Sequence, residues 1–461
     1  MIILKIAIFN IVFIIESFIN IKERFFMKKL HLTSLGCARN QVNSEIMLGS
    51  VGAKVEITED PSEAEYIVVN TCSFIRASVD ESIDTILELS EYKTNGICKK
   101  IIVAGCLPER YREEIKSALP EVDHFLGTGA YDKLNEVIDS EEKRCELPDP
   151  NLVGFTSVPE KRERDNKNLA YVKVAEGCDR GCTYCIIPVL RGKQRSKPSD
   201  YMISEIDTLI KDGAKEILLV AENTTDYGSD IGSDINTLIK EISDGIADDV
   251  WVKILYGHPL TVSDELLKTI ESKKNINSYL DIPVQHASSS VLKRMGRDYN
   301  YETLVELYDR IKTHAPSAAL RTTIIVGFPG ETEEDFQTLL GFVKEVKFDN
   351  LGVFTYSDSE DLPSHKLDNH VPEDIAQDRY DILMAAQQQI SLENNQKRVN
   401  KVYKVLIEEN PEEGVYLGRC EFQAPEVDGI TFVYGENLIP GTFVDVEITD
   451  AYEYDIAGEP K

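Results

Sequence analysis

The chain lacks two features that would each point to a class of protein. Its 461 residues carry 50 Lys and Arg against 80 Asp and Glu, a formal charge of -30, so the basic excess that underlies nucleic-acid affinity is missing. Its nine cysteines are odd in number and spread along a large chain, unlike the dense, even sets that staple small secreted domains. These absences predict a reduced, cytoplasmic protein with no stable nucleic-acid partner, and the acidic charge favours a basic protein partner.

A hydrophobic run that could span a membrane is missing from the N-terminal region. Residues 6–15 are mostly apolar but are interrupted by Asn10 and followed by Glu16, whereas a spanning helix needs about 20 apolar residues. No small-residue cleavage site follows, so a secretory signal is not indicated. We interpret residues 1–26 as an upstream extension outside the fold, with Met27 as the natural start, and expect no membrane partner. The alternative is a weak membrane anchor.

The remaining chain is organised into three predicted domains of an α/β protein. Buried strand patterns alternate with helical patterns over residues 27–150 and again over residues 170–396, which is typical of parallel sheets covered by helices. The first stretch predicts a parallel-sheet α/β domain, and the second, with six strand–helix units, predicts an incomplete (β/α)6 barrel. Residues 151–169 are predicted to be a linker. Short strands separated by turns over residues 397–461 predict a small all-β, OB-like barrel.

Three cysteines occur together in "EGCDRGCTYCIIP", directly after the predicted strand "AYVKVAE". Cys178, Cys182 and Cys185 are separated by three and then two residues, and Gly177 and Gly181 allow the backbone to wrap closely. Three thiolates can hold three irons of a four-iron cluster and leave one iron open to a substrate. The alternative is a zinc loop with a distant fourth ligand, although zinc more often uses paired two-residue spacings.

A second set of cysteines follows three predicted strands of the first domain. Cys37 ends "TSLGC", Cys72 ends "IVVNTC" and Cys106 ends "IIVAGC". Because parallel strands end at one edge of a sheet, where ligands bind, we expect these cysteines to converge on a second cluster site. The alternative is that each is a small buried core residue. The remaining cysteines follow no such pattern and are interpreted as structural, namely Cys98, Cys145 and Cys420.

Weaker signals surround the predicted mouth of the central barrel. "GFPGET", at residues 327–332, predicts a tight turn with close backbone approach to a ligand, and Gln285 and His286 follow another strand, although a lone His is as often structural. "LRGKQRS" supplies a basic stretch that could meet a carboxylate of a cofactor or substrate or could equally be a solvated turn. Its basic residues are Arg191, Lys193 and Arg195.

From about residue 30 to its end, the chain resembles the radical methylthiotransferases. The resemblance rests on "SLGCARNQVNSE", "VNTCSFI" and "AGCLPERY", on "EGCDRGCTYCIIP" with "RGKQRS", and on "YLDIPVQHAS" and "RTTIIVGFPGETEEDF". The terminal strands resemble the TRAM module. "SLGC", "PEVDHFLGTG" and "GRCEFQAPEVDG" are similar to the RimO-type branch, which modifies a ribosomal protein. The alternative is the MiaB-like branch, which methylthiolates a tRNA adenosine derivative.

The resemblance implies a radical-SAM enzyme with two 4Fe-4S clusters and S-adenosylmethionine. It implies that a 5′-deoxyadenosyl radical takes hydrogen from the β-carbon of an aspartate in the small-subunit ribosomal protein numbered twelve, that a methylthio group is then transferred, and that a cytosolic one-electron donor takes part. The implied ligands of the first cluster, which holds the sulfur, are Cys37, Cys72 and Cys106. The implied catalytic ligands of the second, whose open iron binds S-adenosylmethionine, are Cys178, Cys182 and Cys185.

Charge at the C-terminus bears on the choice of substrate. Residues 398–461 hold 5 Lys and Arg against 14 Asp and Glu, which suits a basic ribosomal protein better than tRNA. An alternative of another class is a non-catalytic iron–sulfur carrier, which the open cysteine loop and the six-unit barrel argue against. Two departures from the family pattern, Glu222 and the segment 357–367, put nearby substrate or cofactor contacts in question.

Overall fold

The computed structural model describes residues 27–52, 54–154 and 162–461. The upstream extension interpreted at residues 1–26 and part of the predicted linker lie outside the described residues. The chain divides between Glu163 and Arg164 into two compact units. No helix among the described residues is long and apolar enough to cross a membrane.

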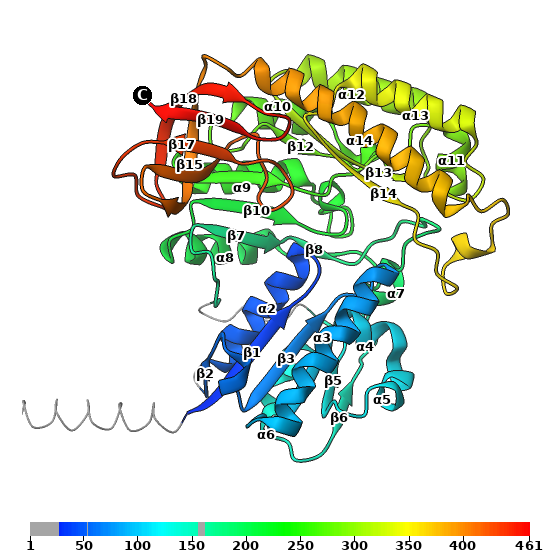
Figure 1. The fold of residues 1–461 in the computed structure, drawn as a ribbon, viewed down its shortest axis with the longest axis vertical. Coiled ribbons are helices and arrows are strands. Elements are labelled where there is room, and N and C mark those ends of the chain that lie inside the picture. The colour runs from blue at the N-terminus through cyan, green and yellow to red at the C-terminus, as the bar shows by residue number, and fades with distance from the viewer. Residues whose placement is uncertain (1–26, 53, 155–161) are drawn as a thin grey trace, which may run out of the picture. The chain divides into compact units, whose positions relative to one another are not determined.

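The first unit is built on a six-stranded parallel sheet in the order β2-β1-β3-β4-β5-β6 (Figure 1). Its two central strands, β3 and β4, are almost wholly buried because helices cover both faces of the sheet. The predicted parallel sheet is confirmed. The strands are β1 (Lys28–Ser34), β2 (Val55–Ile57), β3 (Tyr66–Thr71), β4 (Lys100–Gly105), β5 (His124–Leu126) and β6 (Arg144–Glu146).

Successive residues along each strand contribute side chains to two separate hydrophobic cores, one on each face of this sheet. One core joins Val68 to helix α2 and α6, and the other joins Val69 to α3, α4 and α5. The side-chain period of two along a strand produces this division. The helices are α2 (Ala38–Val51), α3 (Arg76–Asn95), α4 (Cys106–Tyr111), α5 (Ile115–Ala118) and α6 (Leu134–Asp139), with 3-10 turns η1 (Pro61–Glu63), η2 (Arg112–Glu114) and η3 (Tyr131–Lys133).

The second unit begins with an open barrel made of two parallel three-stranded sheets, β11-β10-β7 and β12-β13-β14. The two sheets adjoin at a bridge between Val252 and Ile276. All six predicted barrel strands are present, which confirms the incomplete (β/α)6 barrel. They are β7 (Leu169–Lys173), β10 (Glu216–Val220), β11 (Trp251–Ile254), β12 (Tyr279–Asp281), β13 (Ala319–Val326) and β14 (Asn350–Thr355).

Helices cover the outer face of this barrel, and one apolar cluster joins them to the strands. Helix α14 packs against β14 and α13 (Figure 1). The helices are α7 (Ile187–Arg191), α8 (Ser199–Lys211), α9 (Ile235–Gly245), α10 (Asp264–Ser272), α11 (Ser289–Arg294), α12 (Tyr301–His314), α13 (Glu333–Val346) and α14 (Glu373–Gln396). The short elements are β8 (Ala175–Glu176), β9 (Arg195–Ser196), η4 (Thr224–Asp226), η5 (Pro259–Thr261) and η6 (Pro363–Lys366).

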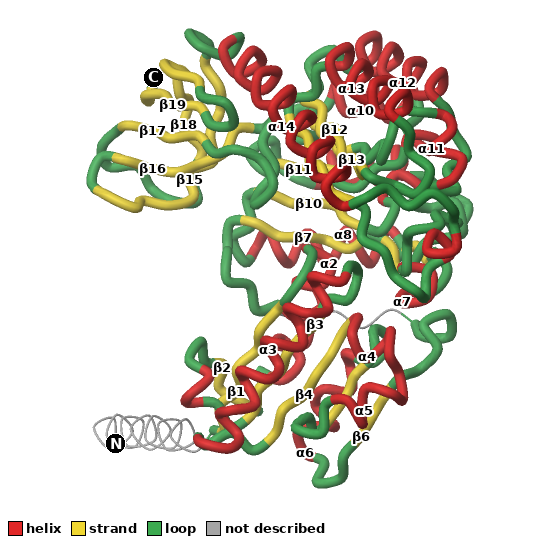
Figure 2. The backbone as a smooth tube through the Cα atoms, turned by 45° about the vertical axis from the view of Figure 1, so that its right-hand side comes forward, coloured by secondary structure: helices red, strands yellow, loops and turns green. Residues whose placement is uncertain are grey.

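The chain ends in a small closed barrel in the order β15-β16-β17-β19-β18, with no helix between its strands (Figure 2). The predicted all-β barrel is confirmed, with one strand, β19, that the turn pattern did not reveal. The strands are β15 (Val402–Glu412), β16 (Val415–Cys420), β17 (Thr431–Tyr434), β18 (Phe443–Ala451) and β19 (Ile456–Pro460).

Buried charges join the small barrel to the amino-terminal ends of the open-barrel strands. Glu216, the first residue of β10, accepts from Lys253 Nζ at 2.5 Å and from Arg419 Nη2 at 2.6 Å, and all three side chains are at most 2% exposed. The hydroxyl of Tyr279, the first residue of β12, donates to Asp428 at 2.6 Å. Fully paired buried charges of this kind favour a single packing arrangement, because removal of any one partner would leave the others buried with an uncompensated charge.

Candidate active site

The first three predicted cysteines follow neighbouring strands of the first unit. Cys37 precedes α2 in an extended conformation, Cys72 directly follows β3, and Cys106 directly follows β4 and begins α4. Since β1, β3 and β4 are adjacent and parallel, all three cysteines lie at the carboxyl edge of the sheet. We call Cys37, Cys72 and Cys106 the strand-end cysteines.

Two glycines allow the backbone to bring these turns close together. Gly36 has φ +90°, and a Cβ there would lie 2.7 Å from Cys72 Cβ. Gly105 has φ +96°, and a Cβ there would lie 2.7 Å from the carbonyl oxygen of Thr71. Only glycine adopts such φ values readily without a steric penalty. The residues immediately before Cys37 and Cys106 are therefore in contact with the Cys72 turn.

The other three cysteines occupy one loop between β8 and α7, and we call them the loop cysteines. The amide of Cys185 donates to the Cys182 carbonyl at 3.1 Å, and the amide of Arg180 donates to Cys178 Sγ at 3.5 Å. Burial raises the pKa of Cys178, and it raises the pKa of Cys185 to about 12. A desolvated thiol of this kind loses its proton when a metal takes its place, so the donor set fits an iron–sulfur cluster.

The two glycines of this loop have different roles. Gly177 has φ +77°, and a Cβ there would lie 2.5 Å from the carbonyl oxygen of Gly192, so the close approach at this point is to the backbone before β9. Gly181 faces open space, so its Cβ is not excluded by the chain. The close approach instead comes from Gly296, where a Cβ would lie 2.6 Å from the Gly181 carbonyl oxygen.

The end of helix α11 and the turn η6 hold the loop in place. Thr183 donates through its amide to the Met295 carbonyl at 3.0 Å and through its hydroxyl to the Arg294 carbonyl at 2.9 Å. The amide of Ser364 donates to the Thr183 carbonyl at 3.0 Å. The segment 357–367, which departs from the family pattern, therefore contacts the cysteine loop directly.

An aromatic and cationic group also surrounds this loop. The guanidinium carbon of Arg297 lies 5.9 Å from the ring centroid of Tyr184 and 5.7 Å from that of Tyr299. His258 contacts the Tyr299 ring edge to face at 5.6 Å, and desolvation lowers the pKa of this histidine to about 2. Sequence reasoning missed this group, because only Tyr184 lies inside the cysteine motif and the others come from distant segments.

Among the residues that the structure describes, no three His, Cys, Asp or Glu side chains are arranged to hold a single metal ion. A four-iron cluster makes a different demand, because its thiolates bind separate irons and their sulfurs are spaced accordingly. The three cysteines interpreted as structural have pKa values raised by burial, and they are Cys98, Cys145 and Cys420.

The weaker sequence signals have structural explanations. His286 is fully buried, its Nδ1 accepts from the Ser288 amide at 2.9 Å, and desolvation lowers its pKa to about 3, so it is a neutral core residue. Arg191 is buried 3.6 Å from the Glu176 carboxylate rather than solvated. In "GFPGET", a Cβ on Gly327 would lie 2.4 Å from Ala376 Cβ, so the close approach there is to helix α14.

The polar linker is also more ordered than its composition suggests. Arg162 ion-pairs with Glu45 at 2.6 Å within the first unit, and Arg164 ion-pairs with Asp212 at 3.1 Å within the second. Both arginine side chains are 1% exposed. Arg162 is therefore fixed to the first unit, and Arg164 is fixed to the second.

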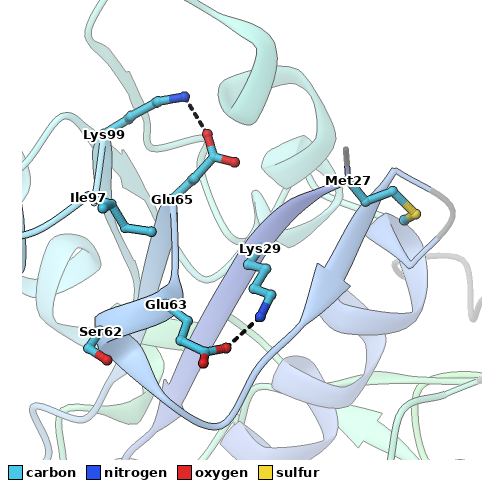
Figure 3. A pocket seen from close by; sticks show the side chains of 7 residues that line it. All are labelled: Met27, Lys29, Ser62, Glu63, Glu65, Ile97 and Lys99. Atoms are coloured by element: carbon cyan, nitrogen blue, oxygen red, sulfur yellow. Dashed lines mark hydrogen bonds and ion pairs between the residues drawn. The ribbon is translucent and has the colours of Figure 1, made fainter. Parts of the chain in front are cut away.

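The first unit also contains an open pocket that is unrelated to the cysteines (Figure 3). Lys29 and Glu63 pair at 2.5 Å beside it, and Lys99 pairs with Glu65. Because Lys29 lies at the start of β1 and Glu65 just precedes β3, the pocket is at the amino edge of the sheet, opposite the strand-end cysteines. It is lined by Met27, Lys29, Ser62, Glu63, Glu65, Ile97 and Lys99.

Comparison with family models gives three matches in the order of the domains. Residues 29–127 match a model described as Uncharacterized protein family UPF0004, residues 172–343 match the Radical SAM superfamily, and residues 399–460 match the TRAM domain. The loop cysteines lie within the second match. The chain is therefore a radical-SAM enzyme, which depends on S-adenosylmethionine and an iron–sulfur cluster.

Relatives define the family more narrowly. A ribosomal protein uS12 methylthiotransferase RimO from Desulfosudis oleivorans is 49% identical over 438 residues, covering 94% of this chain and 99% of that protein. One of the same name from Clostridioides difficile is 43% identical over 442 residues, covering 94% and 99%. The chain belongs to this family of RimO methylthiotransferases.

Solved structures support the fold. The radical S-adenosylmethionine methyltransferase TsrM from Kitasatospora setae, with tryptophan and an S-adenosylmethionine analogue bound, aligns with a TM-score of 0.53 at 13% identity. The alignment covers 73% of this chain and 75% of that chain. At this identity the likeness concerns the fold alone.

Proposed function

We propose that the protein methylthiolates the β-carbon of an aspartate in ribosomal protein uS12, with S-adenosylmethionine as both radical source and methyl donor. The observation that carries the proposal is the presence of two separate cysteine sets, one at the carboxyl ends of three adjacent parallel strands and one in the loop that follows β7 and β8. An enzyme that only generates a radical needs one such set. A second set provides a place to hold the sulfur that the product gains. The names of the relatives supply the substrate.

We assign one 4Fe-4S cluster to each set. The strand-end cysteines, Cys37, Cys72 and Cys106, would hold the first, and the loop cysteines, Cys178, Cys182 and Cys185, would hold the second and leave one iron open to S-adenosylmethionine. The clusters supply one-electron cleavage of S-adenosylmethionine and a sulfur for methylation. The protein would contribute ligands, partly bury the thiols and donate the Arg180 amide hydrogen bond to Cys178 Sγ. Bond cleavage at an unactivated carbon is itself cofactor chemistry.

The small barrel supports a basic protein as the partner. Its acidic excess disfavours tRNA, the substrate of the MiaB-like alternative, and favours a basic ribosomal protein. It packs at the amino ends of the open-barrel strands through Glu216 and Tyr279, whereas the loop cysteines follow the carboxyl end of β7. We therefore infer that it binds the ribosomal protein at a distance from the reacting aspartate. The proposal includes a cytoplasmic location, a cytosolic one-electron donor, and no stable nucleic-acid or membrane partner.

Mass spectrometry tests the substrate directly. In a strain that lacks this protein, uS12 is expected to lose its methylthio group while the tRNA nucleosides stay unchanged, and the purified, reduced protein is expected to restore the group on added uS12. Loss of a methylthio group from tRNA with uS12 unchanged would assign the protein to the MiaB-like alternative. Failure to produce 5′-deoxyadenosine under reducing conditions would revive the carrier alternative.

A further inference from the structure

A buried network of neutral polar side chains lies beneath the strand-end cysteines. Asn40, Ser44, Asn70 and Thr71 are each at most 3% exposed. They come from helix α2 and strand β3 and are linked to one another by hydrogen bonds, including Asn70 Nδ2 to Ser44 Oγ at 2.8 Å. Buried polar groups are costly unless they are hydrogen-bonded, and of these four side chains only Asn70 has an atom, Oδ1, without a partner among the described residues.

Asn40 is the member that joins two of the cysteine turns. Its side-chain amide donates to the Leu35 carbonyl at 2.7 Å and to the Thr71 carbonyl at 3.1 Å. Leu35 lies two residues before Cys37, and Thr71 immediately precedes Cys72. One amide group therefore holds the backbone of both turns.

Asn40 is itself held in position from two sides. Its own backbone amide donates to the Cys37 carbonyl at 2.8 Å, and its backbone carbonyl accepts from Asn70 Nδ2 at 2.9 Å. The side chain is 2% exposed, so water cannot replace the hydrogen bonds that it donates. The rotamer that points the amide at the two turns is consequently fixed by the surrounding structure.

Thr71 extends the connection to the third cysteine. Its hydroxyl donates to the Ala104 carbonyl at 2.6 Å and accepts from the Leu107 amide at 3.1 Å. These residues flank the Gly105–Cys106 pair on either side. The hydrogen bonds of Asn40 and Thr71 thus run continuously from the Cys37 turn through the Cys72 turn to the Cys106 turn.

We propose that Asn40 is a positioning residue for the first cluster, which sets the spacing of the strand-end cysteines through the carbonyl groups of Leu35 and Thr71. This inference rests on the proposed function, which assigns a cluster to these cysteines. Three ligands on separate turns must be held in register before the metal binds, because each misplaced turn adds an ordering cost to cluster binding. A side-chain amide suits this task, since it offers two donors and carries no charge into a buried site.

The test compares Asn40→Ala and Asn40→Asp with the unaltered full-length protein after cluster reconstitution. The aspartate keeps the shape of the side chain but turns acceptor oxygens toward two carbonyl groups. The matched control is Asn135→Ala, which removes an asparagine-to-carbonyl hydrogen bond to Ser50 in the same unit. The measurements are iron per chain, the electron paramagnetic resonance spectrum of the reduced clusters, S-adenosylmethionine cleavage and the melting temperature.

Both Asn40 variants are expected to bind roughly half the iron of the unaltered protein, about four atoms instead of about eight, and to lose methylthiolation. Cleavage of S-adenosylmethionine and the spectrum of the second cluster are expected to persist, and Asn135→Ala is expected to keep all the iron. Full iron content in Asn40→Asp would overturn the proposal. Iron loss in Asn135→Ala equal to that in Asn40→Ala would also overturn it, because the effect would then be general destabilisation. If the unaltered protein itself bound only about four irons, the proposed function would fail instead.

Discussion

The two cysteine sets differ in how the chain assembles them. The loop cysteines lie within eight consecutive residues, so one turn of backbone brings them together. The strand-end cysteines come from three strands that are adjacent only because the sheet has the order β1-β3-β4. Local sequence therefore builds the loop set, whereas the tertiary fold builds the strand-end set. Substitutions at the edge of the sheet should therefore affect the strand-end set far more than the loop set.

The surroundings of the two sets differ as well. Neutral amides and hydroxyls support the strand-end set, with Asn40 and Thr71 as its main donors. The loop set lies against Tyr184, Tyr299 and the cation of Arg297. A nearby fixed positive charge favours a more negative cluster, which is the reduced form that a radical site must reach. The strand-end set also has a cation nearby, since Arg110 donates to the carbonyl of Ser73 beside Cys72, so the two sets differ chiefly in the neutral donors that hold the strand-end turns.

The largest expected effect comes from removing one loop cysteine. Cys182→Ala is expected to abolish S-adenosylmethionine cleavage, and methylthiolation with it, because the cluster with the open iron loses a ligand. About half of the iron is expected to remain at the strand-end set. Chromatographic measurement of 5′-deoxyadenosine, with iron content as the control, checks this result. Undiminished cleavage would remove the loop set from the radical site.

The converse variant separates the two sets. Cys72→Ala is expected to halve the iron and stop methylthiolation while 5′-deoxyadenosine formation continues, because the loop set stays intact. The check is 5′-deoxyadenosine and methylthiolated uS12 measured in the same reaction. An unchanged iron content would instead support the alternative interpretation, in which each strand-end cysteine is a small buried core residue.

The contrast also explains how far the sequence could predict the site. The loop set and all six barrel strands could be recognised because their patterns are local, and the strand-end set could be recognised because "YIVVNT" and "KIIVAG" are visibly buried strands. Short strands such as β2, β5 and β6 have three residues each, too few for a periodic signal. Contacts between distant segments, such as Arg297 on Tyr184, leave no pattern in the sequence.

The environment of some residues could not be decided from the sequence for the same reason. Arg191 and Arg162 lie in polar stretches that resemble solvated turns, yet tertiary packing buries each beside a carboxylate, Glu176 and Glu45 respectively. The glycine at Gly327 signals a close approach correctly, but only the fold reveals that the neighbour is Ala376. Residue type indicates that something approaches the backbone, and the tertiary fold decides what it is.

Substitution of a glycine beside the strand-end cysteines is expected to have a smaller effect, confined to that set. Gly36→Ala is expected to destabilise the first unit by about 1–3 kcal/mol and to lower the iron bound at the strand-end set, because the new Cβ would meet Cys72 Cβ at 2.7 Å with φ at +90°. Gly52→Ala is the control, since its φ is -60° and its Cβ makes only ordinary contacts. Thermal melting and iron analysis test this. Equal iron content in the two variants would mean that a displacement of the Cys37 and Cys72 turns does not impair cluster binding.

Replacing the cation near the loop set tests the role of charge. Arg297→Gln is expected to lower the reduction potential of the loop-set cluster, because one-electron reduction becomes less favourable by an amount on the order of 1 kcal/mol, with the strand-end cluster unchanged. Arg310→Gln is the control, because its side chain pairs with Asp264 on the outer helices. A redox titration followed by electron paramagnetic resonance resolves the two clusters. A raised potential, or equal shifts in both variants, would contradict the argument.

The smallest expected effect concerns stability against pH. Burial lowers the pKa of His258 to about 2 and of His286 to about 3 in the second unit, and that of His124 to about 4 in the first. These imidazoles stay neutral in the fold and gain a proton on unfolding below about pH 6.5, so stability falls as pH drops through that value. Each contributes about 1.4 kcal/mol per pH unit. Burial also raises the pKa of Glu331 in the second unit to about 7, so this carboxyl takes up its proton in the fold and opposes one histidine over the same range. Calorimetry between pH 7 and 5.5 should find the melting temperature of the second unit falling less steeply with decreasing pH in His286→Gln than in the unaltered protein. An unchanged slope would show that His286 is not held neutral in the fold.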